Sequence, residues 1–413
     1  MNLKRLLIPI IAIATVGQLS AQKYEGLADT PPMGWNSWNR FGCDISESLV
    51  REVADAMVES GLADAGFVYI NLDDCWQASE RDADGFPQCD PERFPGGMEA
   101  LVDYVHSKGL KIGIYSCAGT KTCAGKFGSY GHEYQDALQY ARWGFDYLKY
   151  DWCYTDGLNA PAAYKLMSEA IAAAGRPMVF SICEWGSNSP WEWAEPLGHC
   201  WRTTYDICGS YSGERLPGTW GALSVLECLD QTAPLRRYAG KGHWNDPDML
   251  EVGNGFTVNQ DRAHFTMWCM LCAPLMLGND IRTMSDQTAA ILLDKDVIAI
   301  NQDPLGVQAL KHLTECGLEF WLKPLEGEEW AFCILNRTRQ PVEYTIEWQR
   351  FNLTDEEVSQ RSTKFYNTLY DVRDLWNGGE SFNTSHSRTV TVPAEDVILY
   401  RLSPAAKQPK KRR

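Results

Sequence analysis

Eight short apolar segments, separated by longer helical patterns, organise the chain up to about residue 280. The segments have the length and composition of buried β-strands, and they are 34–38, 67–74, 110–116, 145–151, 178–184, 200–203, 243–249 and 274–278. The intervening patterns, such as SESLVREVADAMVESG and HEYQDALQYARWG, end on Gly as many helices do. Strands joined by helical crossovers pair in parallel, and eight of them close a barrel. We therefore expect a (β/α)8 TIM barrel over 22–305.

An open, doubly wound sheet is the alternative for this part of the chain. That fold commonly carries a Gly-rich phosphate-binding turn after its first strand. No such turn follows 34–38. The barrel is therefore the favoured interpretation.

The hydrophobic pattern of the sequence changes after Pro304. Short alternating stretches, among them LEFWLKPL, EEWAFCILN and VEYTIEW, are separated by polar turns. Alternation with a period of two is typical of strands with one buried face. We expect an antiparallel β-domain, a sandwich, over 306–403.

The two ends of the chain have the character of processing and tail segments. Lys4 and Arg5 precede the apolar run LLIPIIAIATVG and a small-residue site ending at Ala21, which is the pattern of a secretory signal peptide over 1–21. We therefore expect the protein to be exported to a periplasm or to the outside of the cell. No later segment has the uninterrupted apolar length of a membrane span, so no membrane insertion is expected. The basic stretch 404–413 is expected to be a disordered tail.

Charge and motifs exclude several classes of function. The formal net charge is −16, and residues 22–403 alone carry −23, because the signal segment contributes +2 and the tail +5. So acidic a body repels phosphate backbones, which argues against a nucleic-acid partner. The chain has no HExxH, P-loop or GxGxxG motif, and its one CxxC, Cys269 to Cys272, lies in an apolar run without a second pair. We therefore expect neither a metal nor an organic cofactor.

Polar and aromatic side chains gather at the ends of the expected strands. Five of the eight strands end in acid, and the residues at strand ends are Trp35, Trp38, Asp73, Asp74, Tyr115, Lys149, Asp151, Glu184, Arg202, Asp206, Asp246 and Asp248. A single Asp at such a place is usually a cap or a turn residue. Several carboxylates at one rim of a barrel repel one another unless they bind a ligand. Carboxylates with Trp, Tyr, Lys and Arg suit a sugar, and glycoside hydrolysis requires two carboxyl groups.

These residues lie in motifs that resemble those of glycoside hydrolase family 27, the α-galactosidases, and the plant and microbial members most of all. The motifs occur in the family's order and are PPMGWNSWNRFGC, INLDDCW, GIYSCAGTKTC, FDYLKYDWC, SICEWG, WRTTYDI and HWNDPDMLEVGN. The resemblance implies the barrel, the C-terminal β-domain, and an exo-acting, retaining α-galactosidase. Its substrate would be an α-galactoside oligosaccharide or polysaccharide.

The resemblance also implies two catalytic residues. Asp151 matches the family's nucleophile and Asp206 its acid/base, which must carry a proton when substrate arrives. Retention by double displacement requires carboxyl groups only about 5–5.5 Å apart. Lys149 would hydrogen-bond sugar hydroxyls, and its charge would help to keep Asp151 ionised.

The remaining matches would bind the sugar. Asp73 and Asp74 correspond to the pair that holds the 4- and 6-hydroxyls, and Trp38 and Tyr115 would line the pocket.

Three further residues would surround the 2- and 3-hydroxyls. Arg202 and Asp248 match hydrogen-bonding positions there, as does Glu184. Family members that act on N-acetylgalactosamine have small residues at the position that matches Glu184. A Glu would fill that space and accept a hydrogen bond from a 2-hydroxyl, which favours galactose.

The same comparison implies three disulfides for a chain with 14 cysteines. These are Cys43–Cys75, Cys123–Cys153 and Cys183–Cys200, with Cys316–Cys333 as a weaker suggestion within the β-domain. Free buried thiols are the alternative.

Two other functions stay open at this point. A β-L-arabinopyranosidase of the same family would act on a sugar with the hydroxyl arrangement of galactose but without C6; the intact Asp73–Asp74 pair favours galactose over it. A non-catalytic sugar-binding protein would have lost a catalytic carboxylate, and both Asp151 and Asp206 are present.

Overall fold

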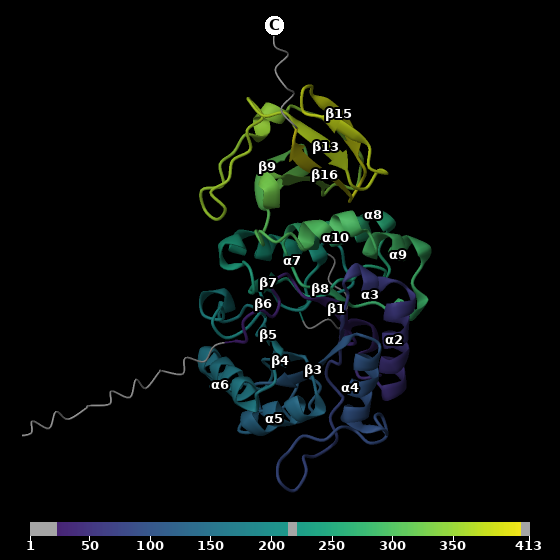
Figure 1. The fold of residues 1–413 in the computed structure, drawn as a ribbon, viewed down its shortest axis with the longest axis vertical. Helices are drawn as coiled ribbons and strands as arrows, with labels where there is room; N and C mark the ends of the chain where they lie inside the picture. Colours follow the sequence, from purple (N-terminus) through teal and green to yellow (C-terminus); the bar gives the residue numbers. More distant parts are fainter. Residues whose placement is uncertain (1–22, 214–220, 406–413) are drawn as a thin grey trace, which may run out of the picture.

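The computed structural model describes residues 23–213 and 221–405 (Figure 1). The predicted signal peptide, 1–21, lies outside the described residues, as does all of the predicted basic tail except Pro404 and Ala405. Among the described residues, no helix has both the length and the apolar character needed to cross a membrane.

The N-terminal part is a barrel of eight parallel strands, which confirms the predicted fold class. The sheet order is β7-β6-β5-β4-β3-β2-β1-β8. A parallel bridge between Leu250, after β7, and Leu277 of β8 joins the two edges of the sheet. The strands are β1 (Met33–Asn36), β2 (Tyr69–Asn71), β3 (Lys111–Cys117), β4 (Tyr147–Asp151), β5 (Val179–Cys183), β6 (Cys200–Arg202), β7 (Trp244–Asp246) and β8 (Leu275–Leu277).

Helices surround the barrel and bury one face against it. In α2, for example, Ser46 caps the N-terminus and Val50, Val53 and Met57 form the buried face. The connection from β5 to β6 departs from the expected strand–helix unit, because it contains only the short 3-10 helix η1 (Pro190–Glu192). The other elements are α1 (Trp38–Phe41), α2 (Glu47–Glu59), α3 (Leu62–Ala65), α4 (Gly97–Ser107), α5 (Glu133–Trp143), α6 (Ala160–Ala174), α7 (Val225–Thr232), η2 (Ala233–Tyr238), α8 (Val258–Met270), η3 (Ile281–Thr283), α9 (Asp286–Leu292) and α10 (Lys295–Asn301).

Alternation along each strand decides which side chains enter the barrel. Leu148 and Tyr150 of β4 belong to the core between sheet and helices, whereas Tyr147 belongs to a small cluster inside the barrel. Because successive side chains point to opposite faces, Lys149 and Asp151 share the inner face with Tyr147. In β5 the same alternation places Val179 inside and Phe180 outside.

The C-terminal part is an antiparallel β-domain, as predicted. A six-stranded sheet has the order β14-β13-β16-β11-β10-β9, and β12 pairs with β15 in a second sheet. Aromatic side chains such as Phe320, Phe332, Trp348 and Phe351 form its separate core. The elements are β9 (Leu310–Glu315), β10 (Leu318–Pro324), η4 (Glu326–Glu328), β11 (Trp330–Asn336), β12 (Val342–Ile346), η5 (Trp348–Phe351), β13 (Tyr370–Asp374), β14 (Ser381–Asn383), β15 (Arg388–Val392) and β16 (Val397–Pro404).

The β-domain packs on the side of the barrel formed by α7, α8 and α10 (Figure 1). Arg236 donates to both carboxylate oxygens of Asp355 at 2.8 and 2.9 Å, and this ion pair is buried. Burial alone would raise the pKa of Asp355, but Arg236 lowers it well below its usual range. Arg262 of α8 forms a second ion pair across the interface, with Asp396.

Candidate active site

A polar cavity lies at the carboxyl ends of the barrel strands. Residues from β1, β2, β3, β4, β6 and β7, or from the loops that follow them, reach it. It is lined by Trp38, Asn39, Asp73, Asp74, Tyr115, Cys123, Lys149, Asp151, Arg202, Asp206, Asp248 and Met249. The structure thus brings nine of the ten expected catalytic and binding residues into one cavity, with Glu184 as the exception.

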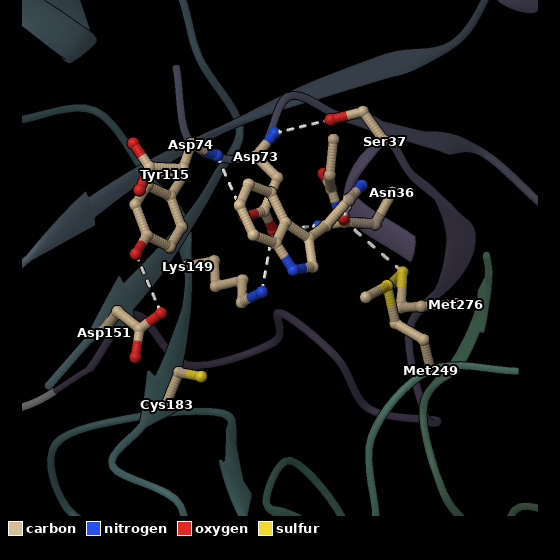
Figure 2. Close-up of polar contacts among 12 residues, drawn as sticks. Asn36, Ser37, Asp73, Asp74, Tyr115, Lys149, Asp151, Cys183, Met249 and Met276 are labelled. Carbon is tan, nitrogen blue, oxygen red and sulfur yellow. Dashed lines mark hydrogen bonds and ion pairs between the residues drawn. The ribbon is translucent and has the colours of Figure 1, made fainter. Parts of the chain in front are cut away.

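Asp151 ends β4 and is oriented by two hydrogen bonds. The Tyr115 hydroxyl donates to Oδ2 at 2.8 Å, and the backbone N–H of Trp152 donates to Oδ1 at 2.8 Å. Figure 2 shows the tyrosine hydroxyl directed at the carboxylate. With only 6 % of the residue exposed, burial raises the pKa of Asp151 to about 7; Asp206 also raises it, while Lys149 acts in the opposite direction. The expected effect of Lys149 is present, but burial outweighs it.

Lys149 forms its ion pair with Asp73 rather than with Asp151. Its Nζ lies 2.7 Å from Oδ2 of Asp73, and the side-chain amide of Asn36 donates to the same oxygen at 2.8 Å (Figure 2). Burial alone would lower the pKa of Lys149, but Asp73, with Asp151 and Asp248, raises it well above its usual value. The ammonium group is therefore cationic and lies among three carboxylates, where it can also hydrogen-bond a ligand hydroxyl.

Asp74 is held by backbone groups of two disulfide-bonded loops. The N–H of Cys75 donates to Oδ1 at 2.7 Å and the N–H of Ala124 donates to Oδ2 at 2.8 Å. Burial is the main cause that raises the pKa of Asp74. The disulfides Cys43–Cys75 and Cys123–Cys153, two of the three predicted, join these loops to their neighbours and so fix the rim of the cavity.

On the opposite side, Arg202 links two carboxylates. Its Nη2 lies 3.0 Å from Oδ1 of Asp206 and 3.1 Å from Oδ2 of Asp248. The side chain of Asp206 is 61 % exposed, whereas that of Arg202 is 3 % exposed. Asp248 also accepts a hydrogen bond from the N–H of Ile207 at 2.8 Å, although its φ of +84° is unusual for a residue with a side chain. The cavity thus holds one buried carboxyl group, that of Asp151, and one that is open to solvent, that of Asp206.

Glu184 does not reach the cavity, contrary to the prediction. It directly follows Cys183, which lies on the inner face of β5, so alternation turns it to the outer face. Its Oε2 accepts hydrogen bonds from the backbone and side chain of Asn188 at 2.7 and 2.8 Å. Its Oε1 is buried without a partner among the described residues, and burial raises the pKa of Glu184 to about 7.

The predicted disulfide Cys183–Cys200 is also wrong: both thiols are free. Cys200 pairs in register with Ser181, two residues before Cys183. An offset of two residues displaces Cys183 from Cys200 by about 6.6 Å along the strand, in addition to the spacing between the strands. The resulting Cα–Cα distance exceeds the reach of a disulfide. Cys316 and Cys333 are likewise unbonded.

Cys183 instead lines the barrel interior next to the cavity, a position that the sequence did not predict for it. The Arg202 Nη1 lies 3.6 Å from its Sγ. Asn36 and Met249 line the same space without having been expected there. The alternation of inner and outer positions along β5, counted from Val179, is the signal that distinguishes Cys183 from Glu184.

Cys123, Asp151 and Cys153 have ligand atoms close enough together for a metal ion. Both sulfurs belong to one disulfide, however, and so cannot act as thiolate ligands. This group is therefore not a metal site.

Comparison with known proteins covers almost the whole chain. A protein-family profile described as Alpha galactosidase A matches residues 30–303, and one described as Alpha galactosidase C-terminal beta sandwich domain matches residues 315–402. The chain is 53 % identical over 395 residues to Alpha-galactosidase A of Cellvibrio japonicus (strain Ueda107), covering 96 % of this chain and 97 % of that protein.

Solved structures agree with the sequence matches. Alpha-galactosidase I from Mortierella vinacea superposes with a TM-score of 0.85 at 36 % identity, over 93 % of this chain and 99 % of that one. A β-L-arabinopyranosidase from Geobacillus stearothermophilus superposes with a TM-score of 0.78 at 22 % identity, over 92 % of this chain and 98 % of that one. The second likeness is one of fold alone.

Proposed function

The chain belongs to the α-galactosidase family, glycoside hydrolase family 27, and from this premise we propose that it is an exo-acting, retaining α-galactosidase that removes terminal α-D-galactosyl residues from galactosides. The observation that carries the proposal is the shared cavity of Asp151 and Asp206, one carboxyl buried and hydrogen-bonded, the other open to solvent. Retaining hydrolysis requires two carboxyl groups with these different tasks.

The reaction proceeds in two displacements. The Asp151 carboxylate attacks the anomeric carbon while Asp206 gives its proton to the glycosidic oxygen, so the bond to the leaving group breaks and an alcohol departs. Asp206, now ionised, takes a proton from water, whose oxygen attacks the anomeric carbon and releases Asp151. Galactose leaves with the configuration it had in the substrate.

The surrounding side chains orient the sugar. Asp73 and Asp74 accept hydrogen bonds from the 4- and 6-hydroxyls, and Lys149 donates to a neighbouring hydroxyl. Arg202 and Asp248 form hydrogen bonds with the hydroxyls on the opposite edge of the ring, and Trp38 covers its apolar face. The fixed hydrogen bonds to Asp73 and Asp74 support these roles, because they hold the carboxylates in place before substrate arrives.

Comparison of two nitrophenyl glycosides tests the proposal. We expect kcat/KM for the α-D-galactoside to exceed that for the β-L-arabinopyranoside by about ten-fold or more, because only galactose offers a 6-hydroxyl to the Asp73–Asp74 pair. A preference for the arabinoside would favour the arabinopyranosidase alternative. Binding of galactose without turnover of either compound would favour a non-catalytic sugar-binding protein.

The pH dependence should reflect the burial of Asp151. Attack requires the ionised carboxylate, and its pKa is raised to about 7, so kcat/KM should rise with pH up to about this value. Lys149 lowers that pKa, so Lys149→Met should move the rising limb to higher pH in addition to slowing the reaction. Profiles of kcat/KM from pH 4 to 9 for the two proteins measure the shift. An unchanged limb in Lys149→Met would contradict the assignment of this pKa to Asp151.

Residues 1–21 are proposed to direct export, with Gln22 as the mature N-terminus, 22–305 as the catalytic barrel and 306–403 as the β-domain. The intact mass of the exported chain tests the cleavage site.

A further inference from the structure

Asp246 is a strand-end acid that has no direct part in the proposed reaction. It ends β7 and pairs in register with Arg202 of β6, so the two residues are neighbours on adjacent strands. Both side chains line the interior of the barrel, together with Lys149, Cys183 and Asp248. Asp246 therefore lies next to two of the residues proposed to bind the sugar, Arg202 and Asp248.

A hydrogen bond to Asp246 fixes the turn that presents the Asp248 carboxylate. Oδ1 of Asp246 accepts the backbone N–H of Asp248 at 2.9 Å, which forms an Asx turn. The φ of Asp248 is +84°, in the left-handed region that residues with a side chain rarely adopt, so this conformation needs support from its surroundings. Trp268 supplies further support, because its indole Nε1 donates to the backbone oxygen of Asp248 at 2.8 Å. The supported turn places the Asp248 carboxylate 3.1 Å from Arg202.

The charge of Asp246 also acts on Arg202. Burial alone would lower the pKa of Arg202, but neighbouring acids, Asp248 first and Asp246 among them, raise it well above its usual value. Since the same guanidinium contacts Asp206, its positive charge favours the ionised form of that carboxyl group. Asp206 must carry a proton when substrate arrives, and a negative charge on Asp246 offsets part of this attraction.

Asp246 changes its charge in mildly acidic solution. Burial raises its pKa to about 6, against the opposing effect of Arg202. The charged and titratable groups that face it are Lys149 and Tyr147 of β4, Cys183 of β5, Arg202 and Cys200 of β6, and Asp248. The ammonium and guanidinium groups stay cationic, and the phenol and both thiols stay neutral, because the pKa of each is raised. None of these five groups therefore has a transition close to that of Asp246.

We propose that Asp246 is a positioning residue of the active site, which holds the turn at Asp248 and offsets the charge of Arg202. Through these two residues it sets the hydrogen-bonding groups for the sugar and helps Asp206 to keep the proton that it donates. The inference rests on the proposed α-galactosidase activity. Asp246 acts through Asp248 and Arg202 and not on the substrate itself.

Two substitutions separate the hydrogen bond of Asp246 from its charge. Asp246→Asn keeps an oxygen for the N–H of Asp248 but removes the charge, whereas Asp246→Ala removes both. Asp261→Asn is the matched control, because Asp261 is also a buried acid that accepts a backbone N–H, from Gly253 at 3.0 Å, and burial raises its pKa to about 6 as well. The measured quantities are kcat and KM on nitrophenyl α-galactoside from pH 4.5 to 8, with the melting temperature of each protein.

We expect Asp246→Asn to lower kcat/KM about ten-fold at pH 8, where the wild-type carboxylate is charged, and less than about two-fold at pH 4.5, where it is protonated. The ratio of wild type to variant should therefore rise with pH through about 6. Asp246→Ala should also raise KM at every pH, because the turn at Asp248 loses its support. Asp261→Asn should leave kcat/KM unchanged throughout.

A loss in Asp246→Asn of the same size at every pH would overturn the role of the charge, and wild-type kinetics in both Asp246 variants would overturn the whole inference. The Asp246→Asn profile remains decisive if Asp246→Ala does not fold. Absence of galactoside hydrolysis by the wild type would instead overturn the proposed function. Galactose binding by calorimetry would then test the positioning: weaker binding by Asp246→Ala than by Asp261→Asn would support it, and equal binding would overturn it.

Discussion

Asp151→Asn should abolish galactoside hydrolysis while leaving a folded protein that still binds galactose. Loss of a catalytic nucleophile typically lowers kcat by about three to six orders of magnitude, because no other group can form the covalent intermediate. The amide can still accept a hydrogen bond from Tyr115 and has nearly the same volume. The measurement is kcat on nitrophenyl α-galactoside, together with galactose binding by calorimetry.

The same substitution has an expected effect on stability with a defined sign. Because the folded-state pKa of Asp151 is raised to about 7, its contribution to stability is complete below its usual pKa near 4 and is lost as pH rises to about 7. Asp151→Asn removes this loss, so its melting temperature relative to wild type should be higher at pH 8 than at pH 4.

Asp156→Asn is the matched control for both measurements, since Asp156 is exposed and lies five residues further along the chain. It should alter neither kcat nor the pH dependence of stability. Wild-type turnover by Asp151→Asn would show that another residue is the nucleophile.

Asp206→Asn should give the second largest loss, and its size should depend on the leaving group. General acid catalysis contributes roughly 10²–10⁴-fold. The full loss is expected for an oligosaccharide, whose alcohol must be protonated to depart, and a smaller loss in the first step for a nitrophenyl group, which departs as an anion. Hydrolysis of the covalent intermediate also slows, because water has lost its general base.

Azide distinguishes this role from a structural one. It needs no base to attack, so it should restore turnover of the nitrophenyl substrate by Asp206→Asn and yield the α-galactosyl azide. Two inversions at the anomeric carbon account for the α configuration. In Asp151→Asn, azide would act in the first displacement and give the β product. Absence of rescue, or a β-azide from Asp206→Asn, would contradict the acid/base assignment. Arg202 keeps its contact with Asp248 in this variant, which protects the local fold.

The barrel and the β-domain follow closely from the sequence because they depend on periodic burial. Buried parallel strands require runs such as FDYLKYD. Because the strands of the barrel are parallel, the carboxyl ends of β1 to β8 all lie at the same rim. Asp73, Asp151 and Arg202 could therefore be assigned to one site from their places in the motifs. The helix expected between β5 and β6 is reduced to η1, and nothing in the length of 185–199 indicates this.

The errors arose where two adjacent residues, or two neighbouring strands, had to be placed relative to each other. Glu184 and Cys183 differ by one position, and that step reverses the face of β5 on which a side chain lies. Cys183 and Cys200 both face inward, but the register of β5 and β6 separates them by two residues. The register between neighbouring strands depends on how the whole barrel closes. It cannot be predicted from a local sequence pattern.

The sequence by itself determined the alternation of strands and helices, the position of the acids at the strand ends, and the motifs that identify the family, because these are properties of local order along the chain. Only the tertiary structure decided that Lys149 pairs with Asp73, that Asp151 is buried enough to have a raised pKa, and that Asp246 lies beside Arg202. Each of these depends on the distances between groups far apart in sequence, and hence on the closed barrel that brings them together.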